Sequence, residues 1–385
     1  MLKKISFVIL INIILFIFVE LSVRLVLDYL NLPKFYKLSN IDSNRYDFLT
    51  GYYNLPNQSE RNLNNIYSQA TDRYGFNLDG KRHAKNLEKK EKNEIRVFIL
   101  GGSTVQGRAL LDKNDPISAR LEKKLNENNI ANKNFFVINA GTTSFISAQE
   151  LGLIQNRIIY ALKPDLIIVL NGTNDATSIP SKEFYLSNSH QFQRNFQKNI
   201  NNQSKSFFYF IDDFFSKNIS TYFLLKKIVE KTTGVYLFDR ENRKYYETLK
   251  ENSMAKEKEY RYYYNIKILS KLASKTIPII TYLQPQMLPK NAKNLSEKDK
   301  IIYDTHKKTN LNYFTNKQKF YDTVLNNIDR YEKLNSQHFI FKDLSGLLSK
   351  NEKNETFYTD HVHYAPVARE IISEKIYKDV IKLIN

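Results

Sequence analysis

Three short, mostly apolar segments, each followed by a glycine-bearing polar loop, constrain the fold of this 385-residue chain more than any other feature. They are Glu94–Leu100, Phe135–Asn139 and Asp165–Leu170. Short apolar runs bounded by turn residues are typical of strands that are buried on both faces of a sheet. Because helix-compatible sequence lies between them, their order predicts a βαβαβ unit and a parallel sheet with helices on both faces.

The remaining sequence extends this pattern towards the C-terminus. Further strands are predicted at Thr276–Leu283 and Gln337–Lys342, and a last helix at about Pro366–Ile384. Ser181–Met254 and Gln286–Asn335 lack clear strands, and we interpret them as helical insertions that form either a structural cap or a substrate lid. The predicted fold class is α/β, a three-layer α/β/α flavodoxin-like parallel sheet with helical insertions.

The N-terminal segment 1–27 predicts a transmembrane helix. An uncharged, mostly apolar run, Ile5–Val19, follows Lys3 and Lys4. Continued to Leu27, this helix would be about 34 Å long, enough to cross a bilayer. Signal-peptide cleavage needs small residues, and the first alanine comes far downstream, which favours an uncleaved anchor. The two lysines predict a single-pass protein with a cytoplasmic N-terminus and an exported, periplasmic or extracellular, remainder.

Glu20 and Arg24 interrupt this helix at a spacing that lets them pair on one face. The uncharged run before them has about 15 residues, a length that also suits the core of a signal peptide. The next segment, 28–93, is rich in asparagine, tyrosine and charge, and we expect a stalk or lead-in there. The organised domain is predicted to cover 94–385.

Composition removes several functional classes. The absence of cysteine excludes a disulfide framework, a thiol nucleophile and a thiolate zinc site. The net charge of +18 suggests an anionic partner, but the lysines are scattered among glutamates and no nucleic-acid-binding motif accompanies them. We therefore expect no nucleic-acid partner, and the sequence does not indicate an oligomeric state.

The loops after the three strands carry the candidate chemistry. Because the carboxyl ends of parallel strands meet at one edge, Ser103, the Gly141 amide and the Asn174 side chain are expected to converge. Ser103 follows a Gly-Gly pair, which allows close backbone approach, and it begins a helix, whose amino end stabilises negative charge. A serine hydroxyl becomes a good nucleophile only when a neighbouring base takes its proton.

The candidate base comes from the C-terminal part of the chain. Of the six histidines, only His361 and His363 lie beside a suitable carboxylate, Asp360. Asp360 and His363 are three residues apart, which in a helical turn places them on one side. Asp360 could then orient the imidazole towards Ser103, whereas His361 would point elsewhere, so we favour His363.

These four segments resemble, in order, the four sequence blocks of the SGNH (GDSL-type) hydrolase superfamily, including its membrane-anchored bacterial-type members. The resemblance implies that Ser103 is the nucleophile, His363 the general base and Asp360 the residue that orients it. It also implies an oxyanion hole formed by the Ser103 amide, the Gly141 amide and the Asn174 side chain.

Three further positions have supporting roles in this comparison: Gly102, Gly172 and Asp175. Gly102 departs from the aspartate that the family name implies, at a position that does not carry the chemistry. The resemblance covers about Glu94–Thr177 and the last 50 residues, and the middle of the chain is unmatched.

The resemblance implies an ester hydrolase that works through an acyl-enzyme without metal or cofactor. An exported, tethered member suggests an ester or acylated carbohydrate as substrate, in particular O-acetyl groups of envelope or secreted glycans. Two alternatives remain: an O-acyltransferase of polysaccharide modification, and a catalytically silent glycan-binding or scaffold protein.

Each candidate residue also has a structural alternative. Ser103, Asn174 and Asp175 could cap helices, and the glycines could simply form turns. Asp360 with its two neighbouring histidines could bind a metal ion, although no other ligands cluster with them. The tyrosines near these motifs, Tyr364 and Tyr262–Tyr264, are expected to pack or to lie on the surface rather than to stack on sugars.

Overall fold

The computed structural model divides the chain into two units, Met1–Asp42 with Asn195–Glu247, and Ser43–Arg194 with Thr248–Asn385. The residues that it describes are 2–29, 44–47, 50–59, 61–63, 66–68, 70–79, 87–107, 115–128, 133–180, 188–189, 211, 214–216, 218–233, 251–309, 312–349 and 354–384. Most of the insertion predicted at 181–254, and the first part of the predicted stalk, lie outside the described residues.

The larger unit is built on a five-stranded parallel sheet. In spatial order its strands are β11 (Phe339–Asp343), β10 (Ile279–Leu283), β7 (Leu166–Asn171), β5 (Glu94–Gly101) and β6 (Asn134–Asn139). Every neighbouring pair is parallel. β5 comes first in the chain and lies between β6 and β7. The chain passes from β5 to β6 on one side and then crosses back to β7 on the other, so the sheet is doubly wound.

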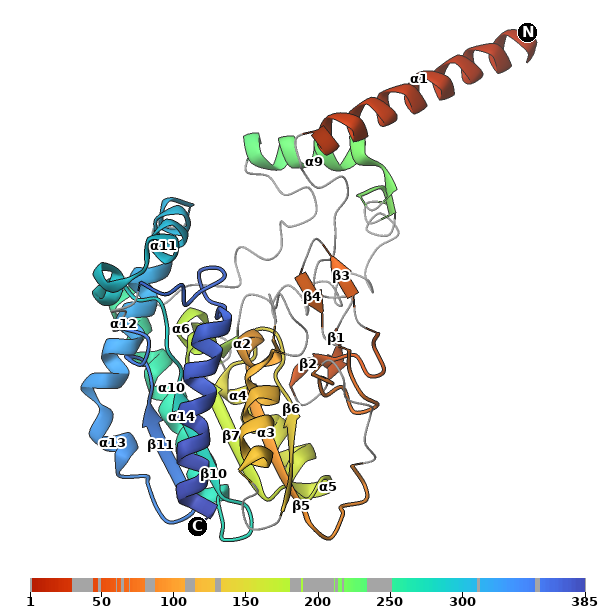
Figure 1. Cartoon of the computed structure of the whole chain (residues 1–385). Coiled ribbons are helices and arrows are strands. Elements are labelled where there is room, and N and C mark those ends of the chain that lie inside the picture. Colours follow the sequence, from red (N-terminus) through yellow and green to blue (C-terminus); the bar gives the residue numbers. More distant parts are fainter. Residues whose placement is uncertain are drawn as a thin grey trace. The chain divides into compact units, whose positions relative to one another are not determined.

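Helices cover both faces of this sheet (Figure 1). α3 (Ile117–Glu127) and α14 (Pro366–Ile384) lie side by side on one face. α4 (Ser147–Leu153) and α10 (Glu251–Leu272) cover the other face, where α12 (Tyr313–Asn326) packs against α10. The predicted three-layer α/β/α class is therefore confirmed.

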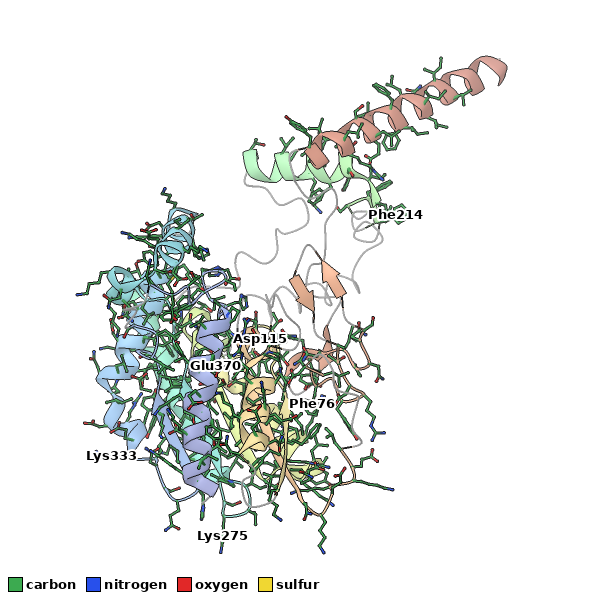
Figure 2. All side chains as sticks on the ribbon, in the orientation of Figure 1. Phe76, Asp115, Phe214, Lys275, Lys333 and Glu370 are labelled. Carbon is green, nitrogen blue, oxygen red and sulfur yellow. The ribbon has the colours of Figure 1, made fainter. Side chains whose placement is uncertain are left out.

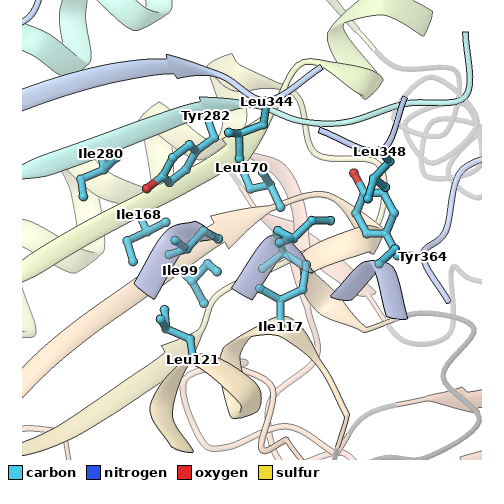
Figure 3. Close-up of a cluster of buried hydrophobic side chains, with 14 of the residues drawn as sticks. Ile99, Ile117, Leu121, Ile168, Leu170, Ile280, Tyr282, Leu344, Leu348 and Tyr364 are labelled. Carbon is cyan, nitrogen blue, oxygen red and sulfur yellow. The ribbon is translucent and has the colours of Figure 1, made fainter. Parts of the chain in front are cut away.

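The face beneath α3 and α14 holds a large apolar cluster, part of which Figure 3 shows. Alternate strand residues such as Ile99, Ile168 and Ile280 lie in this cluster beside Ile117 and Leu121 of α3. The apolar stripe predicted on the last helix also contributes to it, through Ala368, Ile372, Ile376 and Val380. Complete burial of one such aliphatic side chain contributes roughly 1.5–3 kcal/mol, so this cluster dominates the packing of the layer.

Ion pairs join the same two helices at their outer edge. Arg120 of α3 pairs with Asp115 and with Glu370 of α14, both labelled in Figure 2. Lys124, one turn further along α3, lies 2.8 Å from Glu374. These partly exposed pairs fix the alignment of α14 against α3 more than they add stability.

The remaining elements of this unit are short. The helices are α2 (Ser103–Gln106), the π-helical turn η2 (Ile154–Ile158), α5 (Ile159–Ala161), α6 (Thr173–Thr177), the 3-10 helix η3 (Pro289–Asn294), α11 (Glu297–Thr309) and α13 (Ile328–Glu332). The antiparallel pairs are β1 (Asn44–Asp47) with β2 (Gly51–Asn54), β3 (Arg61–Leu63) with β4 (Ile66–Ser68), and β8 (Ile179–Pro180) with β9 (Asn188–Ser189).

All five predicted strands are present, with small differences at their ends. β10 begins at Ile279 rather than Thr276, because the Ile277 N–H donates to Ser274 O in a turn. The insertion predicted at 286–335 is helical, as expected, and contains η3, α11, α12 and α13. The helix predicted at 147–162 is divided into α4, η2 and α5.

The described part of the predicted stalk belongs to the larger unit instead. Tyr52 and Tyr53 of β2 are fully buried, and the Tyr52 hydroxyl donates to Thr143 O at 2.7 Å. The Asn54 and Asn77 side-chain amides both donate to Gly141 O, at 3.1 and 2.8 Å. The segment before the boundary expected at 94 therefore packs against the loop after β6, in the same compact unit as residues 94–194.

The smaller unit contains two long helices, α1 (Leu2–Tyr29) and α9 (Ser220–Thr233). Within α1, Leu10–Leu27 is long and apolar enough to cross a membrane, by length and composition, and a signal sequence would pass the same test. This helix agrees with the apolar N-terminal segment expected from the sequence.

Candidate active site

Ser103 lies where β5 ends. Gly101 is the last residue of β5, and Ser103 is the first residue of α2. The N–H groups of Val105 and Gln106 donate to Gly102 O at 3.1 and 3.0 Å, which starts the helical turn directly after the strand. Ser103 therefore lies at the carboxyl edge of the sheet, beside the point where the strand order reverses, the usual ligand position in such sheets.

The structure brings His363 to Ser103 from the far end of the chain. His363 Nε2 lies 2.8 Å from Ser103 Oγ, and Nδ1 lies 2.6 Å from Asp360 Oδ2. With its proton on Nδ1, the imidazole donates to Asp360 and can accept the Ser103 hydroxyl. The three side chains form the hydrogen-bonded series that an activated serine requires.

Local backbone contacts hold the carboxylate of this series. Asp360 Oδ1 accepts hydrogen bonds from the N–H groups of Val362 at 2.9 Å and His363 at 2.8 Å. Burial raises the pKa of Asp360, but the hydrogen bonds from the His363 ring and from these N–H groups outweigh it, so the pKa lies well below its ordinary value. The carboxylate is consequently ionised, and it favours the imidazole tautomer that can accept from Ser103.

His361 makes different contacts from His363. Its ring stacks on His306 of α11, with centroids 3.8 Å apart and planes 4° from parallel, and Tyr313 meets its edge. Burial, followed by the neighbouring His306, lowers the pKa of His361 to about 4. The geometry thus separates the two histidines in the way that the sequence spacing suggested.

Lys317 of α12 belongs to the same neighbourhood, and no sequence pattern marked it. Its Nζ donates to Gln286 Oε1 and to the Tyr313 hydroxyl, both at 2.9 Å. Burial lowers the pKa of Lys317 to about 7, and the charge of Asp360 acts in the opposite direction. It is one lysine of a lysine-rich insertion, so only its fully buried position distinguishes it.

Asn174 approaches the Ser103 loop closely. Its Nδ2 donates to Phe145 O at 2.8 Å. A Cβ placed on Gly102 would lie 2.3 Å from that same nitrogen. A side chain at position 102 would therefore displace Asn174, which explains why glycine stands there.

Gly141 does not present its amide as expected. Its N–H donates to Asn139 Oδ1 at 3.0 Å, so it is engaged inside the loop. The loop instead turns at Ser144, which has a φ of 60°, immediately before the carbonyl of Phe145 that holds Asn174. A glycine is still needed at 141, because a Cβ there would lie 2.3 Å from the Gln106 nitrogen.

The supporting positions Gly172 and Asp175 begin a buried network below the site. Gly172 has a φ of 102°, a conformation that favours glycine, and it precedes α6. Asp175 is buried and accepts the Ser147 hydroxyl at 2.5 Å and the Ser147 N–H at 3.2 Å. Burial raises the pKa of Asp175 to about 6, against the effect of these bonds.

The tyrosines near the motifs divide between packing and surface. Tyr364 donates to Pro285 O at 2.7 Å, and Tyr262 donates to Asn171 Oδ1 at 2.7 Å, both from buried positions. Tyr260 and Tyr264 are exposed on α10. Within the described ranges, no group of three or more His, Asp or Glu side chains is arranged to hold a metal ion.

The fold and these contacts define a doubly wound α/β protein with a serine, an imidazole and a carboxylate in series at the carboxyl edge of its sheet. No protein-family model matches the chain, and no protein of curated function matches it in sequence.

Similar solved structures include the lipase/acylhydrolase from Enterococcus faecalis, with 11% identity over 74% of this chain and 95% of that chain and a TM-score of 0.38. The acetylxylan esterase Axe2 from Geobacillus stearothermophilus has 11% identity over 75% of this chain and 96% of that chain, with a TM-score of 0.39. The acetyl xylan esterase AlAXEase has 12% identity over 74% and 100%, with a TM-score of 0.35.

Proposed function

We propose that this protein is a serine-dependent ester hydrolase of the SGNH type. The observation that carries the proposal is the contact of His363 Nε2 with Ser103 Oγ at 2.8 Å while Nδ1 is held by Asp360. Residues 260 positions apart have no local reason to meet in this way. A serine that only capped α2 would not need a buried imidazole oriented by a carboxylate.

The proposed reaction proceeds through an acyl-enzyme. Ser103 Oγ attacks the ester carbonyl carbon while His363 Nε2 takes the hydroxyl proton, and Asp360 stabilises the resulting imidazolium. Collapse of the tetrahedral intermediate breaks the ester C–O bond, and His363 returns the proton to the departing alcohol. Water then attacks the acyl-enzyme with His363 again as base, which releases the carboxylic acid and restores Ser103.

The oxyanion hole is proposed to use the Ser103 N–H and the Asn174 amide. Because the Gly141 N–H donates to Asn139, we assign the third donor to the Ser144 N–H at the positive-φ turn of the same loop. Asn174 contacts this turn through Phe145 O, and its Nδ2 lies only 2.3 Å from where a Cβ on Gly102 would be, directly before Ser103. One such donor contributes roughly 100- to 1000-fold in rate.

The proposed substrates are O-acyl esters, in particular O-acetyl esters, of envelope or secreted glycans. Support comes from α1, which we propose is an uncleaved membrane anchor with a cytoplasmic N-terminus and an exported catalytic unit. Such a tether would keep the enzyme beside acylated carbohydrate at the cell surface.

The test is ester hydrolysis by the full-length chain in detergent, with an aryl acetate and with an O-acetylated oligosaccharide. We expect Ser103→Ala and His363→Ala each to lower kcat/KM by at least about 1000-fold. A fluorophosphonate probe should label the wild type and not Ser103→Ala.

Three outcomes would change the assignment. Full activity of Ser103→Ala would exclude the mechanism. Weak hydrolysis together with an acylated product on an added saccharide would indicate an O-acyltransferase. Failure of the probe to label the wild type would indicate a silent glycan-binding or scaffold protein.

A further inference from the structure

The smaller unit joins its two helices through a carboxylate that lies inside the apolar run of α1. Glu20 accepts the Ser220 N–H at 2.7 Å, the Thr221 N–H at 2.9 Å and the Thr221 hydroxyl at 2.8 Å. Arg24 Nε donates to the same carboxylate at 2.8 Å. Because Glu20 is only 8% exposed, its charge is enclosed by Arg24 and by the first turn of α9.

This contact fixes where α9 begins along α1. Counted from Ile5, Glu20 comes about 22 Å along the helix, short of the roughly 30 Å of a hydrocarbon core. An unpaired carboxylate at that depth would be costly. The N–H groups and the positive end of α9 remove this cost, so the first turn of α9 lies at the depth of Glu20.

α9 presents an apolar face to the surroundings. Leu225, Ile228 and Val229 occupy positions i, i+3 and i+4, and they are 57%, 48% and 38% exposed. Phe214 and Phe215, shortly before the helix, are 52% and 36% exposed, and Phe214 is labelled in Figure 2. Five exposed apolar side chains within 16 residues of sequence, next to a candidate span, point to a lipid partner.

The charges of α9 fit the same partner. Its sequence carries Lys226, Lys227 and Lys231 against the single acid Glu230. Lysines beside an apolar face are typical of helices that lie in the membrane interface, where the ammonium groups reach the phosphates and the stems remain in the apolar layer.

We propose that α9, with Phe214 and Phe215, lies in the membrane interface and inserts its Leu225–Ile228–Val229 face into the lipid. The Glu20 contact sets its depth at the side where α1 leaves the bilayer. The inference rests on the proposed anchoring by α1. It explains why a charge pair is placed in an apolar run that is otherwise short for a span.

The chain contains no tryptophan, so one introduced indole reports its own environment. The experiment places Leu225→Trp, Leu15→Trp and Tyr160→Trp separately in the full-length protein. Each is reconstituted in vesicles of phosphatidylcholine and phosphatidylglycerol at about 3:1, with bromine on the acyl chains either near the glycerol or deep in the core. Leu15→Trp tests the span, and Tyr160→Trp is an exposed aromatic position on the catalytic unit.

For Leu225→Trp we expect blue-shifted emission and about twofold or greater quenching by the shallow bromine, with less quenching by the deep one. Combining Leu225→Trp with Glu20→Gln removes the negative charge that accepts the N–H groups of the first turn of α9. This second substitution should reduce the quenching. Leu15→Trp should be quenched by the deep bromine, and Tyr160→Trp should not be quenched.

Two results would overturn the inference in distinguishable ways. Quenching of Leu15→Trp without quenching of Leu225→Trp would keep the anchor and remove the interfacial helix. If the unquenched Leu225→Trp were nevertheless blue-shifted, protein rather than lipid would cover this face. Absence of quenching at both positions would remove the anchor and the interfacial helix together.

Discussion

Gly102 is a residue that we expect to matter for the proposed reaction more than for stability. A Cβ there would meet Asn174 Nδ2 at 2.3 Å, and that nitrogen is the mobile end of a side chain. The fold could absorb the contact by moving Asn174. The proposed oxyanion donor would then leave its position, so the substitution would lower the reaction rate rather than the folding stability.

We therefore expect Gly102→Ala to lower kcat by about 10- to 100-fold. This is less than the roughly 100- to 1000-fold loss expected when one oxyanion donor is removed completely. The melting temperature should change little. Gly346→Ala is the matched control, because the nearest atom to its Cβ would be Ser349 Oγ at 3.8 Å. Wild-type kcat in Gly102→Ala would argue that Asn174 is not a donor.

Lys317 gives a prediction about pH. Its pKa is lowered to about 7 by burial, against an ordinary value of 10.5, so the unfolded chain binds more protons between these values. The wild type should therefore gain stability as pH rises through this window. Relative to Lys317→Met, which lacks the titration, the gain should be about 2 kcal/mol between about pH 7 and pH 9.

Urea unfolding of both proteins at the two pH values measures this difference directly. The comparison does not depend on whatever constant effect Lys317→Met has through its lost bonds to Gln286 and Tyr313. An equal free-energy gap at both pH values would mean that Lys317 titrates normally and is solvated.

At the scale of elements, the Ser147 side chain connects three helices, α4, α6 and α10. Ser147 is the first residue of α4, its hydroxyl donates to Asp175 of α6, and it accepts the amide of Asn265 on α10 at 2.9 Å. Asp175 directly follows Asn174. The buried network thus holds α6, which carries the proposed oxyanion donor Asn174.

Removal of this hydroxyl should be costly. Ser147→Ala leaves the buried Asp175 carboxylate with one strong donor fewer, and we expect a loss of about 1–3 kcal/mol of unfolding free energy. Ser118→Ala is the control, since this buried serine near the start of α3 has no hydrogen-bond partner for its hydroxyl among the described residues. Chemical denaturation of the two variants should separate them, and equal stabilities would show that the network contributes nothing.

The elements also show what a sequence can and cannot predict. The strands were predictable because strands buried on both faces are continuous apolar runs, and their order implied that the loops carrying Ser103, Gly141 and Asn174 would meet. His363 was predicted separately, from its spacing to Asp360. The identity of the backbone amide proposed to face the site could not be predicted from the sequence. It depends on the hydrogen bond from the Gly141 N–H to Asn139 and on the turn at Ser144. Neither feature has a periodicity or a composition of its own.

At the scale of the whole molecule, the same reason hid how far the larger compact unit extends before β5. The segment before β5 binds through Asn54 and Asn77 amides, which donate to backbone carbonyls, and through isolated aromatics such as Phe76. Polar side chains that satisfy distant backbone atoms leave no hydrophobic pattern. A segment rich in asparagine and tyrosine therefore reads as a lead-in, although it packs against the end of β6 and the loop after it.

Two shortened chains test this boundary. A chain that starts at Ser43 keeps the larger unit intact, and it should unfold cooperatively and hydrolyse a soluble aryl ester at close to the full-length rate. A chain that starts at Glu94 loses Tyr52, Tyr53 and Phe76, and removal of one buried aromatic side chain alone costs about 3–5 kcal/mol. Since a domain is stable by only about 5–15 kcal/mol, we expect this chain to be largely unfolded. Circular dichroism melting curves compare the two, and a chain from Glu94 that melted like the chain from Ser43 would support the boundary at 94 and make the segment 43–93 dispensable.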